Sequence, residues 1–165
     1  MRRLLAVMAL VLLSACQVTR MAPSGFSAQQ VEILQANGFE PVGDNWELGL
    51  DNRLLFATDE SNLLPAQSAM IDRMSRALLG IGIRGARVIG HTDSTGSEVH
   101  NDALSVRRAE AVRLAMVAAG MDGDAVHAEG LGARAPVESN RDAAGRSQNR
   151  RVVIIVSPAD AARLD

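Results

Sequence analysis

The sequence has no lysine and no tyrosine, a single cysteine, and only one tryptophan and three phenylalanines. The lone Cys16 excludes an internal disulfide, because a disulfide needs two thiols. All 17 residues counted as Lys or Arg are arginines, whose planar guanidinium groups match carboxylates in a forked geometry. A bias in genomic base composition explains this arginine usage more simply. The chain therefore has few aromatic side chains and no internal disulfide to hold it together.

Long apolar runs are also scarce, and the main one is at the start. Arg2 and Arg3 precede Leu4 to Leu13, about ten residues, which is too short to span a bilayer as a mature helix. Residues 1–15 therefore predict a secretory signal peptide. The tetrad Leu13-Ser14-Ala15-Cys16 resembles a bacterial lipobox, in which the cysteine is lipidated and becomes the mature N-terminus. Gln17 rather than Asp follows, and the sorting rule of such lipoproteins then implies the outer membrane, on its periplasmic face.

About 150 residues remain after the signal segment, a length that suggests one domain. Without Arg2 and Arg3 the chain has 15 basic and 19 acidic residues, a formal charge of −4. This balance argues against nucleic acid as a partner. We expect a lipid-anchored tether with a short helix over residues 16–45, a domain over 46–158 and a tail over 159–165.

One stretch combines a strand, a polar loop and a helix. Ala86 to Ile89 is apolar and reads as a short buried strand. Gly90 to Gly96, Gly-His-Thr-Asp-Ser-Thr-Gly, forms a polar turn, and an amphipathic helix follows that contains Asn101 to Ala109. Open α/β sheets bind ligands at the carboxyl ends of their strands. The sequence therefore places a candidate binding site at this loop.

Two charges stand out in this stretch. Asp93 lies where the strand ends, and Arg108 lies on the apolar stripe of the helix, four residues after Leu104. A buried charge needs a partner. One interpretation is that Asp93 and Arg108 pair with each other. The other is that they share a zwitterionic ligand, with Asp93 binding its ammonium and Arg108 its carboxylate.

Three separated motifs resemble the peptidoglycan-binding domain found at the C-terminus of OmpA. They are Gly90 to Gly96, the Asn101-to-Ala109 segment and Asn149-Arg150-Arg151-Val152, and the match covers roughly residues 54 to 156. In that family the Asp of the first motif and the Arg of the second hold diaminopimelate of the peptidoglycan stem peptide. The resemblance implies a peptidoglycan site formed by Asp59, Asp93, Thr95, Gly96, Asn101, Leu104 and Arg108.

The first loop departs from the family pattern. Ala57 directly follows Phe56, where relatives commonly have an acidic residue, and the resemblance then assigns that contact to Asp59. His91, Asn149 and Arg150 are expected to brace the site. For Asn149 we favour hydrogen bonds to the backbone of the Asp93 loop.

A short helix is predicted before the domain. Ser27 is its N-cap and Gln30 completes a capping box. Gly38 follows its end, and Phe39 can fold back on Leu34 as a Schellman ending requires. A helix this short is marginal in water by itself. It must therefore dock either on its own domain or on a partner.

The predicted strands and helices follow in the order β-α-β-α-β-β. Residues 46–50 alternate, and with a turn at Asp51-Asn52 and an extended stretch at 53–56 they read as a hairpin. Pro65 begins a helix, and Gly130 to Ser147 is loop-like. The β-branched run Val152 to Val156 must be a buried strand. The fold class is α/β (α+β): a sandwich with a small mixed sheet and a helix pair on one face.

An enzyme is not indicated. His91, Asp93 and Ser94 are sequence neighbours, whereas catalytic triads are assembled by geometry, and no nucleophile elbow is present. His91, His100 and His127 lack metal-ligand spacing. We therefore expect no catalysis, no metal and no cofactor.

The segments Gly25 to Gln30, Asn37 to Glu40, Trp46 to Gly49 and Asn149 to Val156 are similar to the YfiB lipoproteins. That family binds peptidoglycan and also captures the periplasmic repressor YfiR, which activates a diguanylate cyclase, raises cyclic di-GMP and promotes biofilm. The resemblance implies a YfiR-like partner, with Phe39, Trp46 and Leu48 as its contacts if they are exposed. The alternative is a structural anchor between outer membrane and peptidoglycan. A homodimer stays open.

Overall fold

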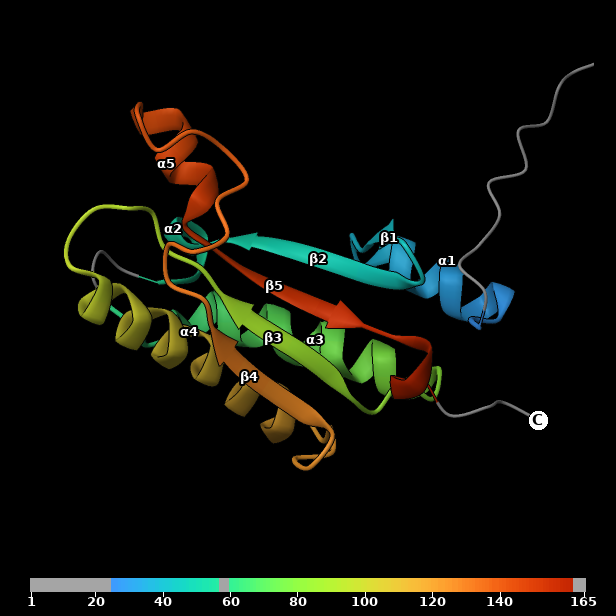
Figure 1. Ribbon diagram of the computed structural model, residues 1–165. Helices are drawn as coiled ribbons and strands as arrows, with labels where there is room; N and C mark the ends of the chain where they lie inside the picture. The colour runs from blue at the N-terminus through green and yellow to red at the C-terminus, as the bar shows by residue number, and fades with distance from the viewer. Residues whose placement is uncertain (1–24, 57–59, 162–165) are drawn as a thin grey trace, which may run out of the picture.

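The computed structural model describes residues 25–56 and 60–161 (Figure 1). The predicted signal peptide, Cys16 and Asp59 lie outside the described residues. Within these ranges no helix combines the length and apolar character needed to cross a membrane. In chain order the elements are α1 (Ala28–Ala36), β1 (Glu40–Val42), β2 (Asn45–Asp51), α2 (Asn52–Leu55), α3 (Pro65–Gly80), β3 (Ala86–Gly90), α4 (Glu98–Ala118), β4 (Val126–Gly130), α5 (Ala143–Asn149), β5 (Arg151–Val156) and the 3-10 turn Pro158–Asp160.

The sheet has five strands in the order β1-β2-β5-β3-β4. β3 and β4 are parallel, and every other neighbouring pair is antiparallel. The predicted mixed α/β fold is confirmed. The last strand in the chain, β5, is the central strand of the sheet, as its β-branched sequence requires. One correction concerns residues 130–147, because α5 begins inside the segment that the sequence suggested was all loop.

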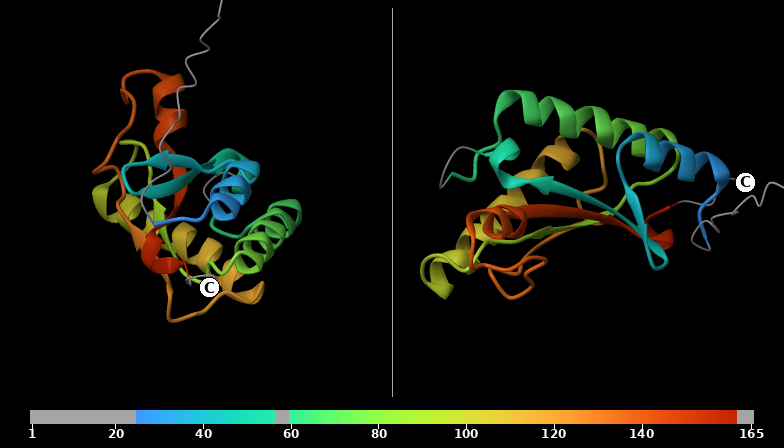
Figure 2. Two further views of the ribbon diagram at one scale, coloured as in Figure 1. Left: turned by 90° about the vertical axis from the view of Figure 1, so that its right-hand side faces the viewer. Right: turned by 90° about the horizontal axis from the view of Figure 1, so that it is seen from above.

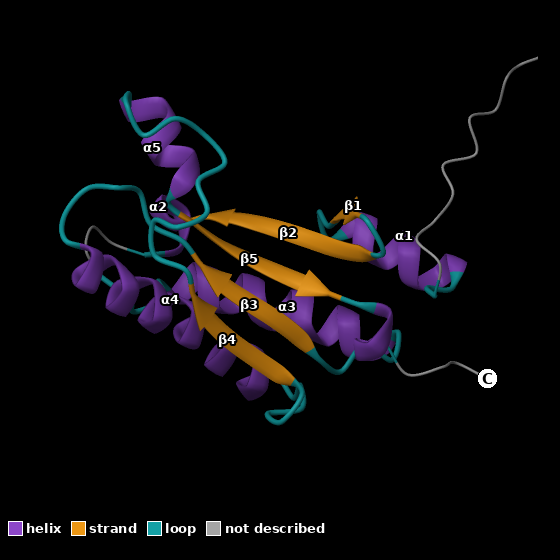
Figure 3. Ribbon diagram, in the orientation of Figure 1, coloured by secondary structure: helices purple, strands orange, loops and turns teal. Residues whose placement is uncertain are grey.

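Helices α3 and α4 cover one face of the sheet, and in Figure 3 the strands pass in front of them. Figure 2 shows α1 and α3 together on this side of the strands. Alternate residues of β5, namely Val152, Ile154 and Val156, are completely buried on the covered face. The register pairs Trp46 with Val156 and Leu48 with Ile154, so β2 adds its even-numbered residues to the same core.

The hairpin is one strand earlier than the sequence analysis predicted. β1 and β2 pair around a turn in which Gly43 has a φ of +59°, a conformation that favours glycine. Residues 52–55 are helical rather than extended, because the Asp51 carboxylate caps this turn and accepts from the Arg53 amide at 2.7 Å. β2 continues to Asp51 because it pairs with β5 from Trp46 to Asp51.

Helix α1 has the predicted caps. The Ser27 hydroxyl accepts from the Gln30 amide at 3.2 Å, and the Gln30 side chain accepts from the Ser27 amide at 2.8 Å. At its other end the Phe39 amide donates to Leu34 O at 3.0 Å, with Gly38 at φ +83°, which is a Schellman ending. The helix docks on its own domain: Leu34 is fully buried, and Gln30 Nε2 donates to Ile81 O at 3.0 Å.

Phe39 and Trp46 do not meet the condition of exposure on which their role as partner contacts depended. Phe39 is 3% exposed and Trp46 is 1% exposed, and both belong to the same core as Ile154. Leu48 is partly buried and packs against that core. The alternation of residues along β2 predicts two faces, but only the docking of helices decided which face is covered. These rings therefore do not provide an exposed partner surface.

Candidate functional site

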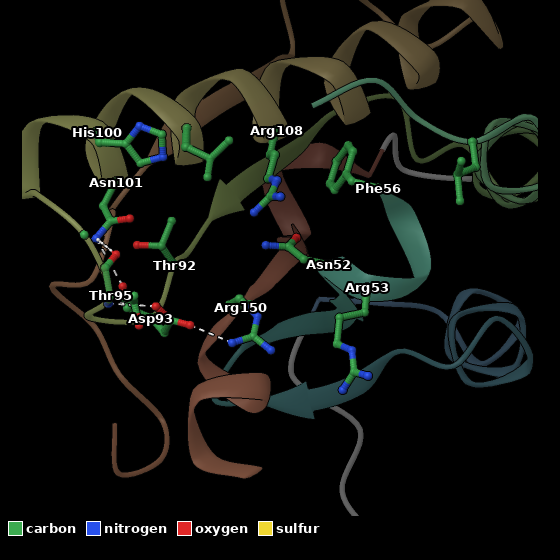
Figure 4. A pocket seen from close by; sticks show the side chains of 13 residues that line it. Asn52, Arg53, Phe56, Thr92, Asp93, Thr95, His100, Asn101, Arg108 and Arg150 are labelled. Carbon is green, nitrogen blue, oxygen red and sulfur yellow. Dashed lines mark hydrogen bonds and ion pairs between the residues drawn. The ribbon is translucent and has the colours of Figure 1, made fainter. Parts of the chain in front are cut away.

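A pocket of about 840 Å³ opens beside the loop that follows β3 (Figure 4). Its walls come from that loop, the first half of α4, the α2 turn and the residue before β5. The residues that line it are Asn52, Arg53, Phe56, Leu64, Thr92, Asp93, Thr95, Gly96, His100, Asn101, Leu104, Arg108 and Arg150. Six of the seven residues predicted to contact peptidoglycan line this pocket, three from the loop after β3 and three from α4; the seventh, Asp59, lies outside the described residues.

Helix α4 is held very close to the sheet at the pocket. A Cβ on Gly90 would collide with the backbone carbonyl of Ser105, and one on Gly130 would collide with Ser105 Oγ and the Val106 amide. The Ser105 hydroxyl also accepts from the Gly132 amide at 3.0 Å. This close approach sets how far Arg108, one turn further along α4, extends over the strand ends.

Asp93 is 7% exposed, and both of its carboxylate oxygens are engaged. Oδ1 accepts from the Thr95 amide at 2.8 Å, and Oδ2 accepts from Arg150 Nη1 at 2.6 Å. Burial raises the pKa of this carboxyl, but the hydrogen bonds from Arg150 and Thr95 outweigh burial and leave the pKa below its usual value. Asp93 is therefore an ionised, oriented acceptor at neutral pH.

Arg108 is 5% exposed and faces the pocket from α4 (Figure 4). Its Nε donates to the Glu60 carbonyl at 2.9 Å, and its guanidinium carbon lies 5.2 Å from the centre of the Phe56 ring, within the range of a cation–π contact. The first interpretation, in which Arg108 and Asp93 pair with each other, is not what the structure shows, because the ion-pair partner of Asp93 is Arg150.

Asn101 fastens the loop to the start of α4. Its side-chain amide donates to the carbonyls of Asp93 at 3.3 Å and Thr95 at 3.0 Å. Gly96, at φ +90°, lets the chain turn into the helix. Leu104 is 6% exposed and supplies an apolar part of the wall.

Asn149 contacts the backbone of residues 137 and 138 rather than, as predicted, the backbone of the Asp93 loop. Its Oδ1 accepts from the amides of Val137 at 2.8 Å and Glu138 at 3.0 Å, and its Nδ2 donates to Glu138 O at 2.7 Å. It also donates to Asn140 Oδ1 at 3.0 Å, and that oxygen accepts from the Ser94 amide at 3.2 Å. Asn149 is thus linked to the loop of Asp93 through a single intervening side chain.

His91 is 5% exposed and is not among the residues that line the pocket. Its Nδ1 is buried without a hydrogen-bond partner, so this atom contributes no bond to the bracing role predicted for His91. Burial, assisted by the charge of Arg151, lowers its pKa from 6.5 to about 4. The backbone of His91 is well held, with its amide donating to Arg151 O at 2.9 Å.

Several pocket residues were missed by the sequence analysis. Asn52 was taken for part of a turn, and Thr92 lies inside the recognised motif but was given no role. Arg53 and His100 also line the pocket. Arg150 was expected only as a brace, whereas it carries the ion pair with Asp93. No local sequence signal identifies Asn52, because its place in the pocket depends on β2 and β5 pairing.

The fold and pocket first define the class of domain. The peptidoglycan-associated lipoprotein from Burkholderia pseudomallei has a similar solved structure, with a TM-score of 0.56 and 29% identity, covering 65% of this chain and 87% of that one. The chain therefore has the α/β sandwich of OmpA-like domains.

A family model and two relatives of similar sequence agree with the assignment to OmpA-like domains. Residues 55–150 match the model of the OmpA family. The outer-membrane lipoprotein YfiB of Pseudomonas aeruginosa is 43% identical over 94% of this chain and 92% of its own length. The lipoprotein YfiB of Escherichia coli K12 is 36% identical over 89% of this chain and 91% of its own. The chain belongs to the OmpA family and, within it, to the YfiB lipoproteins. The P. aeruginosa relative is named as an outer-membrane lipoprotein, the location expected for this chain.

Proposed function

We propose that this chain is an outer-membrane lipoprotein that binds peptidoglycan non-covalently, with the pocket holding diaminopimelate of the stem peptide. The observation that carries the proposal is the pair of buried, opposite charges, Asp93 and Arg108, that face one pocket from different elements. A zwitterionic group has the complementary charges, an ammonium for Asp93 and a carboxylate for Arg108. The name of the solved B. pseudomallei relative points to the same ligand class.

The contacts of both residues suit this role. Phe56 and the Glu60 carbonyl fix the plane of the Arg108 guanidinium, so little side-chain entropy is lost when a carboxylate binds. The ligand ammonium has to share Asp93 with Arg150, whose side chain is 31% exposed. Binding is therefore expected to weaken the Asp93–Arg150 contact without leaving either charge unpaired.

The test is co-sedimentation of the lipid-free protein with purified sacculi. Asp93→Asn and Arg108→Gln should each reduce affinity about tenfold or more, since hydrogen bonds to charged groups contribute about 1.5–3 kcal/mol. Loss of a buried charge can also destabilise the fold, so circular dichroism and thermal melting accompany each variant.

The matched control is Arg113→Gln. Arg113 is on the same helix as Arg108 but pairs with Glu110 at 2.9 Å outside the pocket, so its replacement should leave binding unchanged. Folded Asp93→Asn and Arg108→Gln proteins that sediment with sacculi like the wild type would refute the proposal.

We also propose that the chain captures a YfiR-like periplasmic repressor and thereby raises cyclic di-GMP. The support is that 94% of the chain, including the segment before the OmpA match, aligns with the P. aeruginosa YfiB at 43% identity. Because Phe39 and Trp46 are buried, the contact surface has to lie elsewhere.

A pull-down distinguishes signalling from simple anchoring. The lipid-free protein is used as bait against periplasmic extract and, separately, against sacculi. A specific periplasmic protein retained by the wild type supports capture. If the protein binds sacculi but retains no periplasmic protein, the result supports a structural anchor between outer membrane and peptidoglycan.

A further inference from the structure

Two polar atoms of the pocket are buried without a hydrogen-bond partner: Asn52 Oδ1 and Thr92 Oγ1. Asn52 is 3% exposed and Thr92 is 5% exposed. Among the described residues, no other side-chain atom in this state belongs to a residue that lines the pocket. A buried polar group left unpaired costs roughly 1–3 kcal/mol. A fold that keeps two of them in one pocket calls for an explanation.

The backbone amide and the side-chain nitrogen of Asn52 are both hydrogen-bonded, and only the side-chain oxygen Oδ1 has no partner. Its backbone amide donates to Arg150 O at 3.1 Å, and its Nδ2 donates to His91 O at 3.3 Å. Through these two bonds Asn52 links the residue before β5 to the residue after β3. The side-chain nitrogen Nδ2 therefore has a structural role. Oδ1 can only accept a hydrogen bond, so it requires a ligand N–H or O–H.

Thr92 is fixed by its backbone in the same way. Its amide donates to Gly132 O at 2.9 Å, and the neighbouring His91 carbonyl is the group that anchors Asn52. The side chain of Asn52 is therefore hydrogen-bonded to the residue that directly precedes Thr92. Figure 4 shows Asn52 projecting between Arg108 and Arg150, with Thr92 on the side of Asp93.

We infer that Asn52 and Thr92 form a neutral polar subsite in the pocket, which positions the head group of an amino acid between the two charges. Asn52 Oδ1 accepts an N–H from the ligand amine, and the Thr92 hydroxyl donates to a carboxylate oxygen of the ligand. This assignment rests on the proposed binding of diaminopimelate, and it adds two contacts that the charges alone do not supply. The subsite favours a ligand with both groups on one carbon over a simple anion.

The clearest test is Thr92→Val, which replaces the hydroxyl with a methyl of similar shape. Affinity for a diaminopimelate-containing stem tripeptide, measured by calorimetry, should fall about five- to tenfold, the value of one net hydrogen bond. The melting temperature of the free protein should stay the same or rise, because the variant buries no unpaired hydroxyl. Thr92→Ser, which retains a hydroxyl, should bind more tightly than Thr92→Val.

Asn52 is tested with two variants that both lose the bond to His91 O. Asn52→Asp keeps an acceptor in the pocket, whereas Asn52→Leu removes it. The tripeptide should therefore bind more tightly to Asn52→Asp than to Asn52→Leu. Ser94→Ala is the control, since the Ser94 side chain is exposed in the same loop and outside the pocket lining.

The outcomes separate this inference from the proposed function. If Asp93→Asn loses the tripeptide but Thr92→Val binds it like the wild type, the subsite is wrong and the proposed function stands. A Thr92→Val protein with a lowered melting temperature would make the hydroxyl structural and would also overturn the inference. If the wild type does not bind the tripeptide, the diaminopimelate assignment fails and the subsite fails with it.

Discussion

Asp93 and Arg108 are each oriented by a backbone group and by a neighbouring side chain. Arg150 and the Thr95 amide hold Asp93, and the Glu60 carbonyl with the Phe56 ring holds Arg108. Such preorganisation reduces the entropy lost on binding. A ligand therefore meets charges that are already in place, and the affinity of the site depends on residues that never touch the ligand as well as on those that do.

The buried ring of His91 predicts how the stability of the protein depends on pH. Its folded pKa, about 4, lies below the ordinary 6.5 because the ring is buried and Arg151 is near. The unfolded chain then takes up a proton as the pH falls below 6.5, while the folded protein does not until about pH 4. The contribution of neutral His91 to the free energy of unfolding is therefore fully present above pH 6.5 and is lost as the pH falls from 6.5 to 4. Urea unfolding across this range should show the decline.

His91→Gln should flatten this dependence, because glutamine does not titrate. The two proteins should differ in the slope of unfolding free energy against pH between 6.5 and 4, whatever their absolute stabilities. Equal slopes would mean that other groups cause the decline.

At the scale of elements, the decisive contact is between α4 and the ends of β3 and β4. Gly90 lets the Ser105 carbonyl, and Gly130 the Ser105 hydroxyl and the Val106 amide, come closer than any side chain would allow. The helix carries Asn101, Leu104 and Arg108 toward the loop after β3. The geometry of the site therefore depends on two positions without a Cβ, neither of which lines the pocket.

Gly90→Ala should destabilise the protein by about 1–3 kcal/mol, the usual cost of overpacking a filled interface, and should weaken binding to sacculi because α4 must shift. Chemical denaturation measures the first effect and co-sedimentation the second. Gly49→Ala is the matched control: it is also in a strand, and a Cβ there meets nothing within 4 Å. A Gly90→Ala protein as stable as Gly49→Ala would contradict the close contact.

At the scale of the molecule, the segment before the OmpA match is part of the core. α1 docks through Leu34 and Gln30, and β1 and β2 extend the sheet on the side of β5. Phe39 and Trp46 enter the same hydrophobic cluster as Ile154. A partner that binds this region therefore meets a packed surface instead of exposed rings.

Phe39→Ala should reduce the free energy of unfolding by about 3–5 kcal/mol, as expected for a buried phenylalanine. Urea denaturation measures it. Val42→Ala, at a residue of β1 that is 50% exposed, should change stability by less than about 0.5 kcal/mol. If both substitutions had equally small effects, the segment would not be part of the folded core.

Local rules were sufficient for several features. The capping box of Ser27 and Gln30, the Schellman ending at Gly38 and the helix that begins at Pro65 each depend on neighbours within a few residues, so the sequence predicts them. The buried β5 follows from its β-branched run. Six of the seven residues assigned to the peptidoglycan site by the resemblance share one pocket.

Other features depended on pairing between distant segments. β5, the last strand in the chain, paired with both β2 and β3, and the helices that cover one face of this sheet took Trp46 out of solvent. The partner of Asp93 is likewise Arg150, 57 residues away.

The sequence by itself therefore determined α1 with its caps, the start of α3 and the buried strand β5, because these follow from local geometry and side-chain type. The family resemblance of its motifs supplied Asp93 and Arg108 as the residues with binding chemistry. Only the tertiary structure decided which ion pair forms, which rings are buried and which polar atoms, Asn52 Oδ1 and Thr92 Oγ1, are left for a ligand. The physical reason is that burial and hydrogen-bond satisfaction are properties of the whole packed arrangement, and no short segment contains them.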